Sequence, residues 1–293
     1  MQQIRSAESS TLTSQGLVAF KQALDQAQRQ FNQTHQELES AKQVERLAVD
    51  LHGRWANGWA MKRLRKKRFA EIALAAEDAK ALREELQQQL DLSRLPTQFE
   101  MADEVAKAYG ELRDAFVGLS RSQRIWDNVA HRATHRIAER TTASRIVDLK
   151  PVRFELDRCG VIDAPMTVPK MANANGGDLY FYPGFLIYHA STTNYALVEY
   201  AELDMHVRRN QFHEESRPPT DAQQVGTTWA KANKDGTPDR RFNDNYAIPV
   251  MQYAIITLQT ASGLNEEYMV SNVNAAEVFA AAWDAMCSAQ RRT

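Results

Sequence analysis

The chain has 293 residues, a formal net charge of −1 and a pI near 6.7. This length is sufficient for about two domains, each with its own core. The balanced charge excludes a general electrostatic attraction to nucleic acid or to anionic membranes, so such a partner would have to bind at a local patch.

Cysteine content and hydropathy indicate the cellular setting. Cys159 and Cys287 are the only cysteines, and both stand among apolar neighbours. Two cysteines so far apart form neither a disulfide framework nor a metal knuckle, so we expect reduced core residues. The segment 1–16 is polar, and no stretch approaches the roughly 18 uncharged residues of a membrane helix. We therefore expect a cytoplasmic protein without a transmembrane segment.

The character of the chain changes at Lys150-Pro151. Pro96 is the only proline before this point, and the other eight follow it. Because proline disrupts helix interiors, the change predicts two modules with different packing. We predict a helical bundle or coiled-coil stalk over residues 1–150 and a β-rich domain over residues 151–293.

The first half shows the three-four spacing of apolar residues that is typical of amphipathic helices. This spacing predicts long helices over 17–51, from about 59 to 95, and over 105–137. Two glycines in the segment 52–58 favour a chain reversal, and Leu95-Pro96 ends the second helix. Short connections favour an antiparallel bundle, with a coiled coil between chains as the alternative.

A basic run marks the start of the second predicted helix, directly after Trp55 and Trp59. It consists of Lys62, Arg63, Arg65, Lys66, Lys67 and Arg68. One interpretation is a patch for nucleic acid or an anionic membrane surface, with the tryptophans at a lipid interface or stacked on bases. The other is a solvated helix start whose charges pair with acidic residues of a neighbouring helix.

Two histidines in the third predicted helix raise the question of a metal site. His131 and His135 are four residues apart and would share one face of a helix. Arg132 and Arg136 would repel a cation, and no third ligand can be assigned. We therefore predict no metal and no other cofactor.

The second half shows the period-two pattern of half-buried strands. Val152, Phe154 and Leu156 alternate with charged residues, and the turn Pro183-Gly184 joins two apolar runs into a hairpin. Further strands are predicted over 195–200, 203–207, 227–230, 248–257 and 267–270, followed by an amphipathic helix over 274–290 that Asn272 or Asn274 caps. Many short strands predict an antiparallel barrel or sandwich, and an α+β protein as a whole.

This order of strands, closed by a C-terminal helix with Trp283 on its apolar face, resembles the pleckstrin-homology and GRAM-like domains over residues 151–290. The segments 173–185 and 229–245 are similar to uncharacterised bacterial proteins. The resemblance implies a binding module. Phosphoinositide-binding members carry clustered basic residues in the first hairpin loop, whereas the loop 158–178 offers only Arg158 and Lys170 beside two aspartates.

The segment 229–245 is the densest polar stretch of the chain, and three interpretations compete for it. As a binding loop, it offers Arg240 and Arg241 for bidentate contacts to a carboxylate or phosphate. As a catalytic loop, it offers Asp235, Asp239 and Asp244 for a divalent metal, with His213 as a base. As plain structure, it offers two turns whose charges pair internally. The candidate partner-binding residues are Trp229, Lys234, Asp239, Arg240, Arg241, Phe242 and Asn245.

A second polar turn, Asn173 to Gly177, lacks the lysine of a phosphate-binding loop, and its glycines predict positive φ. No nucleophile motif is recognisable in the chain. The leading hypothesis is a non-enzymatic adaptor whose stalk mediates self-association or docking and whose β domain binds a protein partner. The alternatives are a nucleic-acid- or membrane-associated protein that uses the basic run, and a metal-dependent nuclease.

Overall fold

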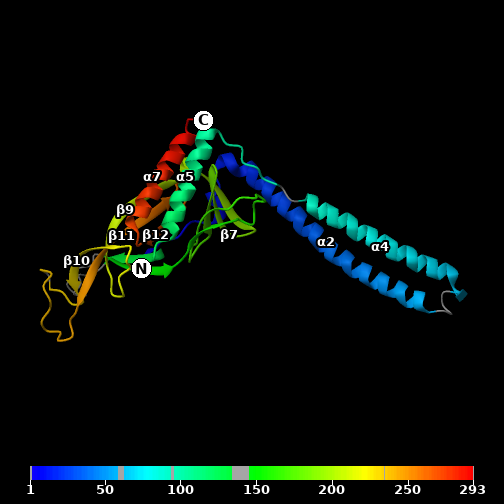
Figure 1. Cartoon of the computed structure of the whole chain (residues 1–293), viewed down its shortest axis with the longest axis horizontal. Helices are drawn as coiled ribbons and strands as arrows, with labels where there is room; N and C mark the ends of the chain where they lie inside the picture. Colours follow the sequence, from blue (N-terminus) through cyan, green and yellow to red (C-terminus); the bar gives the residue numbers. More distant parts are fainter. Residues whose placement is uncertain (1, 59–62, 94–95, 134–144, 234, 293) are drawn as a thin grey trace. The chain divides into compact units, whose positions relative to one another are not determined.

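The computed structural model describes residues 2–58, 63–93, 96–133, 145–233 and 235–292 (Figure 1). It is an α+β protein that divides into two compact units. The sheet unit comprises Met1–Ala19, Gln98–Gly160 and Pro165–Thr293. The hairpin unit comprises Phe20–Thr97 and Val161–Ala164.

The hairpin unit is built from two long helices, α2 (Val18–Asn57) and α4 (Lys66–Leu92), which run side by side in opposite directions (Figure 1). Both confirm the predicted helical periodicity. The seam between them contains a cluster of Leu38 and Ala41 on α2 with Leu86 and Leu90 on α4, against which Phe31 packs. The other buried positions are Leu24 and Thr34 on α2 and Ile72 and Ala79 on α4. Arg83 of α4 reaches Glu45 of α2 at 3.2 Å.

The third predicted long helix is confirmed only in its first half. Helix α5 (Asp103–Ser120) ends 17 residues before the predicted end at 137, and the strand β2 (Ile125–Ala133) follows it. Helix α5 belongs to the sheet unit. The helical region is therefore a two-helix hairpin and not a three-helix bundle. His131 lies on β2, so it has no helical neighbour four residues later, and His135 is outside the described residues.

The division between the units also differs from the predicted boundary at Lys150-Pro151. These two residues end the strand β3 (Arg145–Pro151), which pairs antiparallel with β2. Lys150 is opposite Asp127, and Pro151 is opposite Trp126. The change in proline content therefore falls at the end of a strand inside the sheet unit.

The sheet unit contains two antiparallel sheets, so of the two predicted alternatives, barrel or sandwich, the closed barrel is wrong. The seven-stranded sheet has the order β1-β2-β12-β11-β10, with β3 beside β2 and β9 beside β11. Its other strands are β1 (Gln2–Gln3), β9 (Asp204–His213), β10 (Gln223–Trp229), β11 (Ala247–Gln259) and β12 (Asn265–Val270). The five-stranded sheet is a meander of β4 (Phe154–Asp157), β5 (Val168–Met171), β6 (Asp178–Tyr182), β7 (Phe185–Ser191) and β8 (Asn194–Glu199).

Most strands after residue 151 confirm the period-two prediction, including the β6–β7 hairpin and β8 to β12. The prediction missed β5, as well as β1 to β3 earlier in the chain. Along β11 the side chains alternate between two apolar clusters, because successive residues of a strand point to opposite faces. Ala254, Ile256 and Leu258 belong to the main core, and Tyr253 and Ile255 to a cluster on the other face.

Helix α7 (Val273–Gln290) lies beside α5 and completes the main core (Figure 1). Trp283 is 3% exposed, as the apolar face of the helix predicted. The predicted cap is confirmed, since Asn272 Oδ1 accepts a hydrogen bond from the Ala275 amide at 3.0 Å. Cys159 and Cys287 are free and buried, also as predicted. None of the described helices is long and apolar enough to cross a membrane.

Candidate functional site

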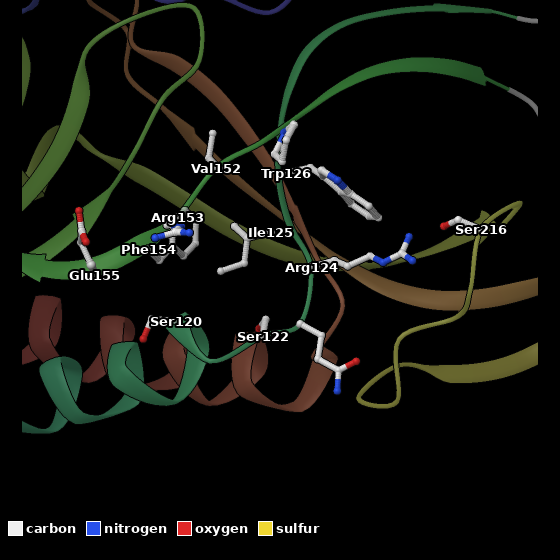
Figure 2. A pocket seen from close by; sticks show the side chains of 12 residues that line it. Ser120, Ser122, Arg124, Ile125, Trp126, Val152, Arg153, Phe154, Glu155 and Ser216 are labelled. Carbon is white, nitrogen blue, oxygen red and sulfur yellow. The ribbon is translucent and has the colours of Figure 1, made fainter.

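A pocket of about 590 Å3 opens beside the segment that joins α5 to β2 (Figure 2). The end of β3 and the start of β4 form another part of its wall, and Ser216 contributes from a loop. Its apolar lining includes Ile125, Val152 and Phe154, and its cations are Arg124 and Arg153. No motif in the sequence indicated this pocket, which we call the arginine pocket.

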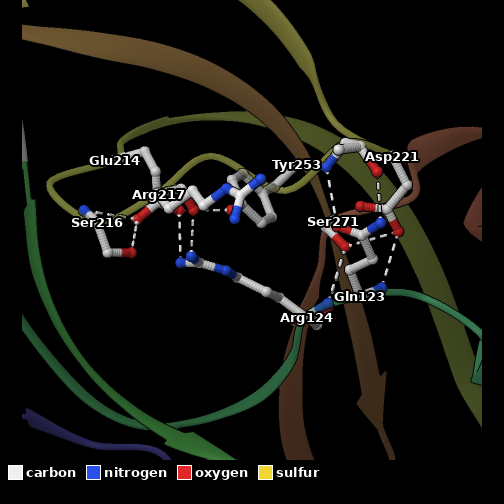
Figure 3. Close-up of polar contacts among 9 residues, drawn as sticks. Gln123, Arg124, Glu214, Ser216, Arg217, Asp221, Tyr253 and Ser271 are labelled. Carbon is white, nitrogen blue, oxygen red and sulfur yellow. Dashed lines mark hydrogen bonds and ion pairs between the residues drawn. The ribbon is translucent and has the colours of Figure 1, made fainter.

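Arg124 is fixed in place by three contacts (Figure 3). Its guanidinium donates to Glu214 Oε2 at 2.8 Å and to the Arg217 carbonyl oxygen at 2.5 Å. It also lies over the ring of Trp126, 5.4 Å from the ring centroid, at a distance typical of a cation–π contact. Two of the five N–H donors of the guanidinium are therefore engaged before any ligand arrives.

Glu214 is the acidic centre of this network and is only 3% exposed. It accepts hydrogen bonds from Tyr253 Oη at 2.6 Å and from Ser216 Oγ at 2.6 Å. Burial acts to raise the pKa of Glu214, but the bonds from Ser216 and Tyr253 and the charge of Arg124 lower that pKa overall. Glu214 is therefore a carboxylate stabilised by its neighbours.

A second group of contacts continues from the same segment (Figure 3). Asp221 accepts from the Gln123 amide at 2.8 Å and from Ser271 Oγ at 3.0 Å. Ser271 Oγ in turn accepts from the Arg124 amide at 3.0 Å. Together, the two groups attach the α5–β2 connection to the loop after β9 and to the end of β12.

The chemistry that the pocket offers is limited. Ser120 and Ser122 donate their hydroxyl protons to the carbonyl oxygens of Val117 and Leu119. Ser216 donates its proton to Glu214. Ser120 and Ser122 are therefore not paired with a base among the described residues, and the Glu214 carboxylate that Ser216 contacts is also engaged by Arg124 and Tyr253. Arg153, which is exposed, makes no ion pair within the described part of the chain. The described residues of this pocket thus offer arginine and hydroxyl groups for polar contacts.

Two acidic side chains lie buried elsewhere in the sheet unit. Asp127 of β2 and Glu266 of β12 are each 1% exposed. Asp127 accepts from the Ala174 amide at 2.8 Å, and Glu266 accepts from Ser6 Oγ at 2.5 Å. Burial raises the pKa of Asp127 to about 6 and that of Glu266 to about 7, against the effect of these hydrogen bonds.

The turn Asn173 to Gly177 closes over this acidic pair. Besides the Ala174 amide, the Asn175 side chain donates to the Ile4 carbonyl oxygen at 2.9 Å. The predicted positive φ is wrong for both glycines, since positive φ occurs at Gly184, Gly236 and Gly263 among the described glycines. A Cβ at Gly177 would lie 2.8 Å from the His189 carbonyl carbon, so close packing explains the glycine.

The segment 229–245 forms a loop with an internal ion pair. Asp239 is 3% exposed, and its carboxylate accepts from Arg241 Nε at 2.9 Å and from Arg241 NH2 at 2.8 Å. Asn245 closes the loop through two hydrogen bonds to the Lys231 backbone, at 2.9 and 2.7 Å. Internal pairing thus engages Asp239, Arg241 and Asn245, and the interpretation of this segment as plain structure accounts for them.

The remaining predicted residues of this loop are less constrained. Arg240 is exposed, lines a hollow of about 470 Å3, and makes no ion pair with a described residue. Trp229 ends β10, and Trp229 and Phe242 are half-buried. Lys234 lies outside the described residues. Partner binding at this loop stays a prediction, for which Arg240 is the available cation.

Metal ligands do not gather in the described part of the chain, where no three His, Cys, Asp or Glu side chains come together in a suitable cluster. Asp235 is engaged by Thr237, whose hydroxyl donates to it at 2.7 Å. With Asp239 held by Arg241, two of the three aspartates of the nuclease interpretation have other partners.

The basic run lies at the start of α4. Arg68 pairs with Glu71 of its own helix at 3.0 Å. Arg63, Arg65, Lys66 and Lys67 are exposed and make no ion pair with any described residue. Lys62 and Trp59 lie outside the described residues, and Trp55 is half-buried. The predicted pairing with a neighbouring helix is therefore absent among the described residues of the hairpin, and these charges are available to another molecule.

The hairpin unit also exposes large apolar side chains. Of the eleven that are exposed among the described residues, eight belong to this unit: Val44, Leu47, Val49, Leu51, Leu64, Leu74, Leu82 and Leu92. A groove of about 440 Å3 lies between the helices, lined by Ala41 and Val44 of α2 and by Leu82 and Leu86 of α4. Gln36, Glu37 and Ser40 complete its lining. We call this surface the hairpin groove.

Comparison with known proteins gives no assignment, since no protein family, curated protein or solved structure matches the chain. The resemblance to pleckstrin-homology and GRAM-like domains therefore stays a prediction.

We expect Arg124→Ala to lower the free energy of unfolding by roughly 1–3 kcal/mol, because it leaves the buried Glu214 carboxylate without its cation. Urea denaturation measures this change. Arg153→Ala is the matched control, since Arg153 lines the same pocket but makes no ion pair with a described residue, and it should change stability by less than about 0.5 kcal/mol. Equal losses in the two variants would contradict the structural role of Arg124.

The acidic pair predicts a pH dependence. Between its unfolded pKa near 4.5 and its folded pKa of about 7, Glu266 keeps a proton in the folded state that the unfolded chain releases. Its contribution to stability therefore falls as the pH rises through this window. We expect Glu266→Gln to become more stable relative to the parent protein from pH 4.5 to 8, as measured by thermal unfolding. A stability difference that does not change with pH would contradict the assignment.

The internal ion pair of the 229–245 loop predicts different roles for two adjacent arginines. Arg241→Ala should speed amide hydrogen exchange at residues 231–245, because Asp239 loses its bidentate partner. Arg240→Ala should leave exchange unchanged. If both variants exchange at the rate of the parent protein, the ion pair does not order the loop.

Proposed function

We propose that this chain is a non-enzymatic assembly protein whose hairpin unit docks onto other α-helices through the hairpin groove. The observation that carries the proposal is the concentration of exposed apolar side chains on a two-helix hairpin. Val44, Leu47 and Leu51 are 55%, 71% and 45% exposed, and they follow one another on α2 at three-four spacing. This spacing is the pattern of a helix face that packs against another helix.

The energetics favour docking over permanent exposure. The seam between α2 and α4 buries few large side chains, so tertiary burial within the unit supports a long hairpin only weakly. Covering each partly exposed valine or leucine of the stripe would contribute roughly 1 kcal/mol. Leu82 on α4 extends the same surface across the groove. An additional helix in this groove would convert the hairpin into a bundle, in which α2 packs against α4 on one face and against the added helix on another.

The sheet unit supports a non-enzymatic role in a different way. Its arginine pocket and its 229–245 loop are held by internal ion pairs, as in a scaffold. Partner recognition by the loop, through Arg240, remains the secondary site of this proposal. The pleckstrin-homology-like architecture and a cytoplasmic location belong to the same proposal.

Site-specific photocrosslinking in cells tests the docking surface. A photoreactive residue at Leu47 should form a covalent adduct, and the mass of that adduct identifies its partner. The matched control is Arg46, which is exposed on the same helix but points about 100° away. The control should form no adduct. The absence of adducts at Leu47, or equal adducts at both positions, would overturn the proposal.

A further inference from the structure

We infer that the occupant of the hairpin groove is the hairpin of a second copy of this chain, packed antiparallel to the first. This inference rests on the proposed docking function and names its partner. A twofold axis at the level of Leu47 would bring the apolar stripe of α2 onto the stripe of the second copy and Glu37 beside its basic end, since such an interface uses the same surface on both copies. The apolar stripe of α2 and Leu82 of α4 would then face their own counterparts across the interface.

The distribution of charge along the hairpin favours this partner. One end of α4 carries Arg63, Arg65, Lys66 and Lys67, and none of them forms an ion pair with a described residue. From Phe69 to Leu92 the charge is mostly acidic, with Glu71, Glu77, Asp78, Glu84, Glu85 and Asp91 against Lys80 and Arg83. The hairpin is therefore basic at one end and acidic along much of the rest of α4.

Unpaired acidic groups lie where the basic end of a second copy would meet them. Glu37 lines the groove on the side of Val44 that is away from the basic end. Its described hydrogen bond comes from Gln33, at 3.0 Å. Glu85 precedes the groove residue Leu86 on α4 and accepts from Gln89. Neither glutamate forms an ion pair with a described residue.

The orientation follows from these charges. A parallel pair would place two unpaired basic ends side by side, and like charges in contact oppose association. An antiparallel pair places each basic end beside the Glu37 and Glu85 region of the other copy. Because of the twofold symmetry, this contact between a basic end and the Glu37 and Glu85 region occurs twice. Charge therefore selects the antiparallel arrangement, while the apolar groove provides the buried apolar area.

Analytical ultracentrifugation of the full chain tests this arrangement over a range of concentrations. We expect a dimer whose dissociation constant rises at least about tenfold in the Arg65→Glu/Lys67→Glu variant and in the Glu37→Lys/Glu85→Lys variant. All four side chains are exposed, so circular dichroism should show an intact helical hairpin. The chain with all four substitutions should recover dimerisation, because antiparallel packing again pairs opposite charges.

Arg46→Glu/Lys80→Glu is the matched control, since it reverses two exposed positive charges of the same helices away from the groove. It should dimerise like the parent chain. If the control variant weakens dimerisation as much as the charge-reversal variants do, the antiparallel arrangement is overturned. It is also overturned if the four combined substitutions fail to restore the dimer. A chain that is monomeric at all concentrations overturns the second copy as partner. If the chain is monomeric but a photoreactive residue at Leu47 still forms an adduct with another protein, the docking function stands. If the chain is monomeric and Leu47 forms no adduct, both proposals are overturned.

Discussion

The main constraint on this protein is that a pair of helices has only one seam in which to bury apolar side chains. In the hairpin unit, this seam alternates leucine with alanine and threonine, and Glu45 and Arg83 occupy one of its layers. Small and charged residues at seam positions allow the helices to approach closely but bury little apolar area per turn. Apolar side chains are then left exposed on the outer faces of the two helices, among them Val44, Leu47 and Leu82. Long helices with so thin a core gain most when a further helix completes the bundle.

The sheet unit differs from the hairpin unit, because it has a large apolar core but also buries several charged groups. Glu214 is stabilised by Arg124, Tyr253 and Ser216, and no comparable cation approaches Glu266 among the described residues. Their pKa values shift in opposite directions for this reason: hydrogen bonds and a cation favour the charged form of Glu214, and desolvation favours the neutral form of Glu266. The two buried glutamates thus make opposite contributions to the pH dependence of stability.

Periodicity predicted those elements that follow one rule, namely that their buried positions carry apolar residues. Helices α2, α4 and α7 and most of the strands β6 to β12 have mainly apolar residues at their buried positions, although β12 also buries Glu266. Strand β2 breaks that rule, because it buries Asp127 and Asn128, and its apolar residues Trp126, Val129 and Ala133 happen to keep helical spacing. The sequence therefore indicated a helix where a strand pairs with β3 and β12. The arginine pocket was unpredictable for a related reason. Arg124 and Glu214 are separated by 90 residues, and only the pairing of strands brings them together.

Composition indicated the basic run, but only the structure shows its environment. In isolation, four uncompensated basic residues at the start of a helix are unfavourable, since they lie near the positive end of the helix dipole. The described part of the hairpin contributes only the Arg68–Glu71 pair to reduce this charge. Nucleic acid would also neutralise the run but would leave the apolar groove uncovered, and an anionic membrane could cover apolar side chains but would repel the Glu37 carboxylate in the groove lining. A helix with its own acidic and apolar positions satisfies both features at once, and for this reason the groove and the basic run are best explained by one partner.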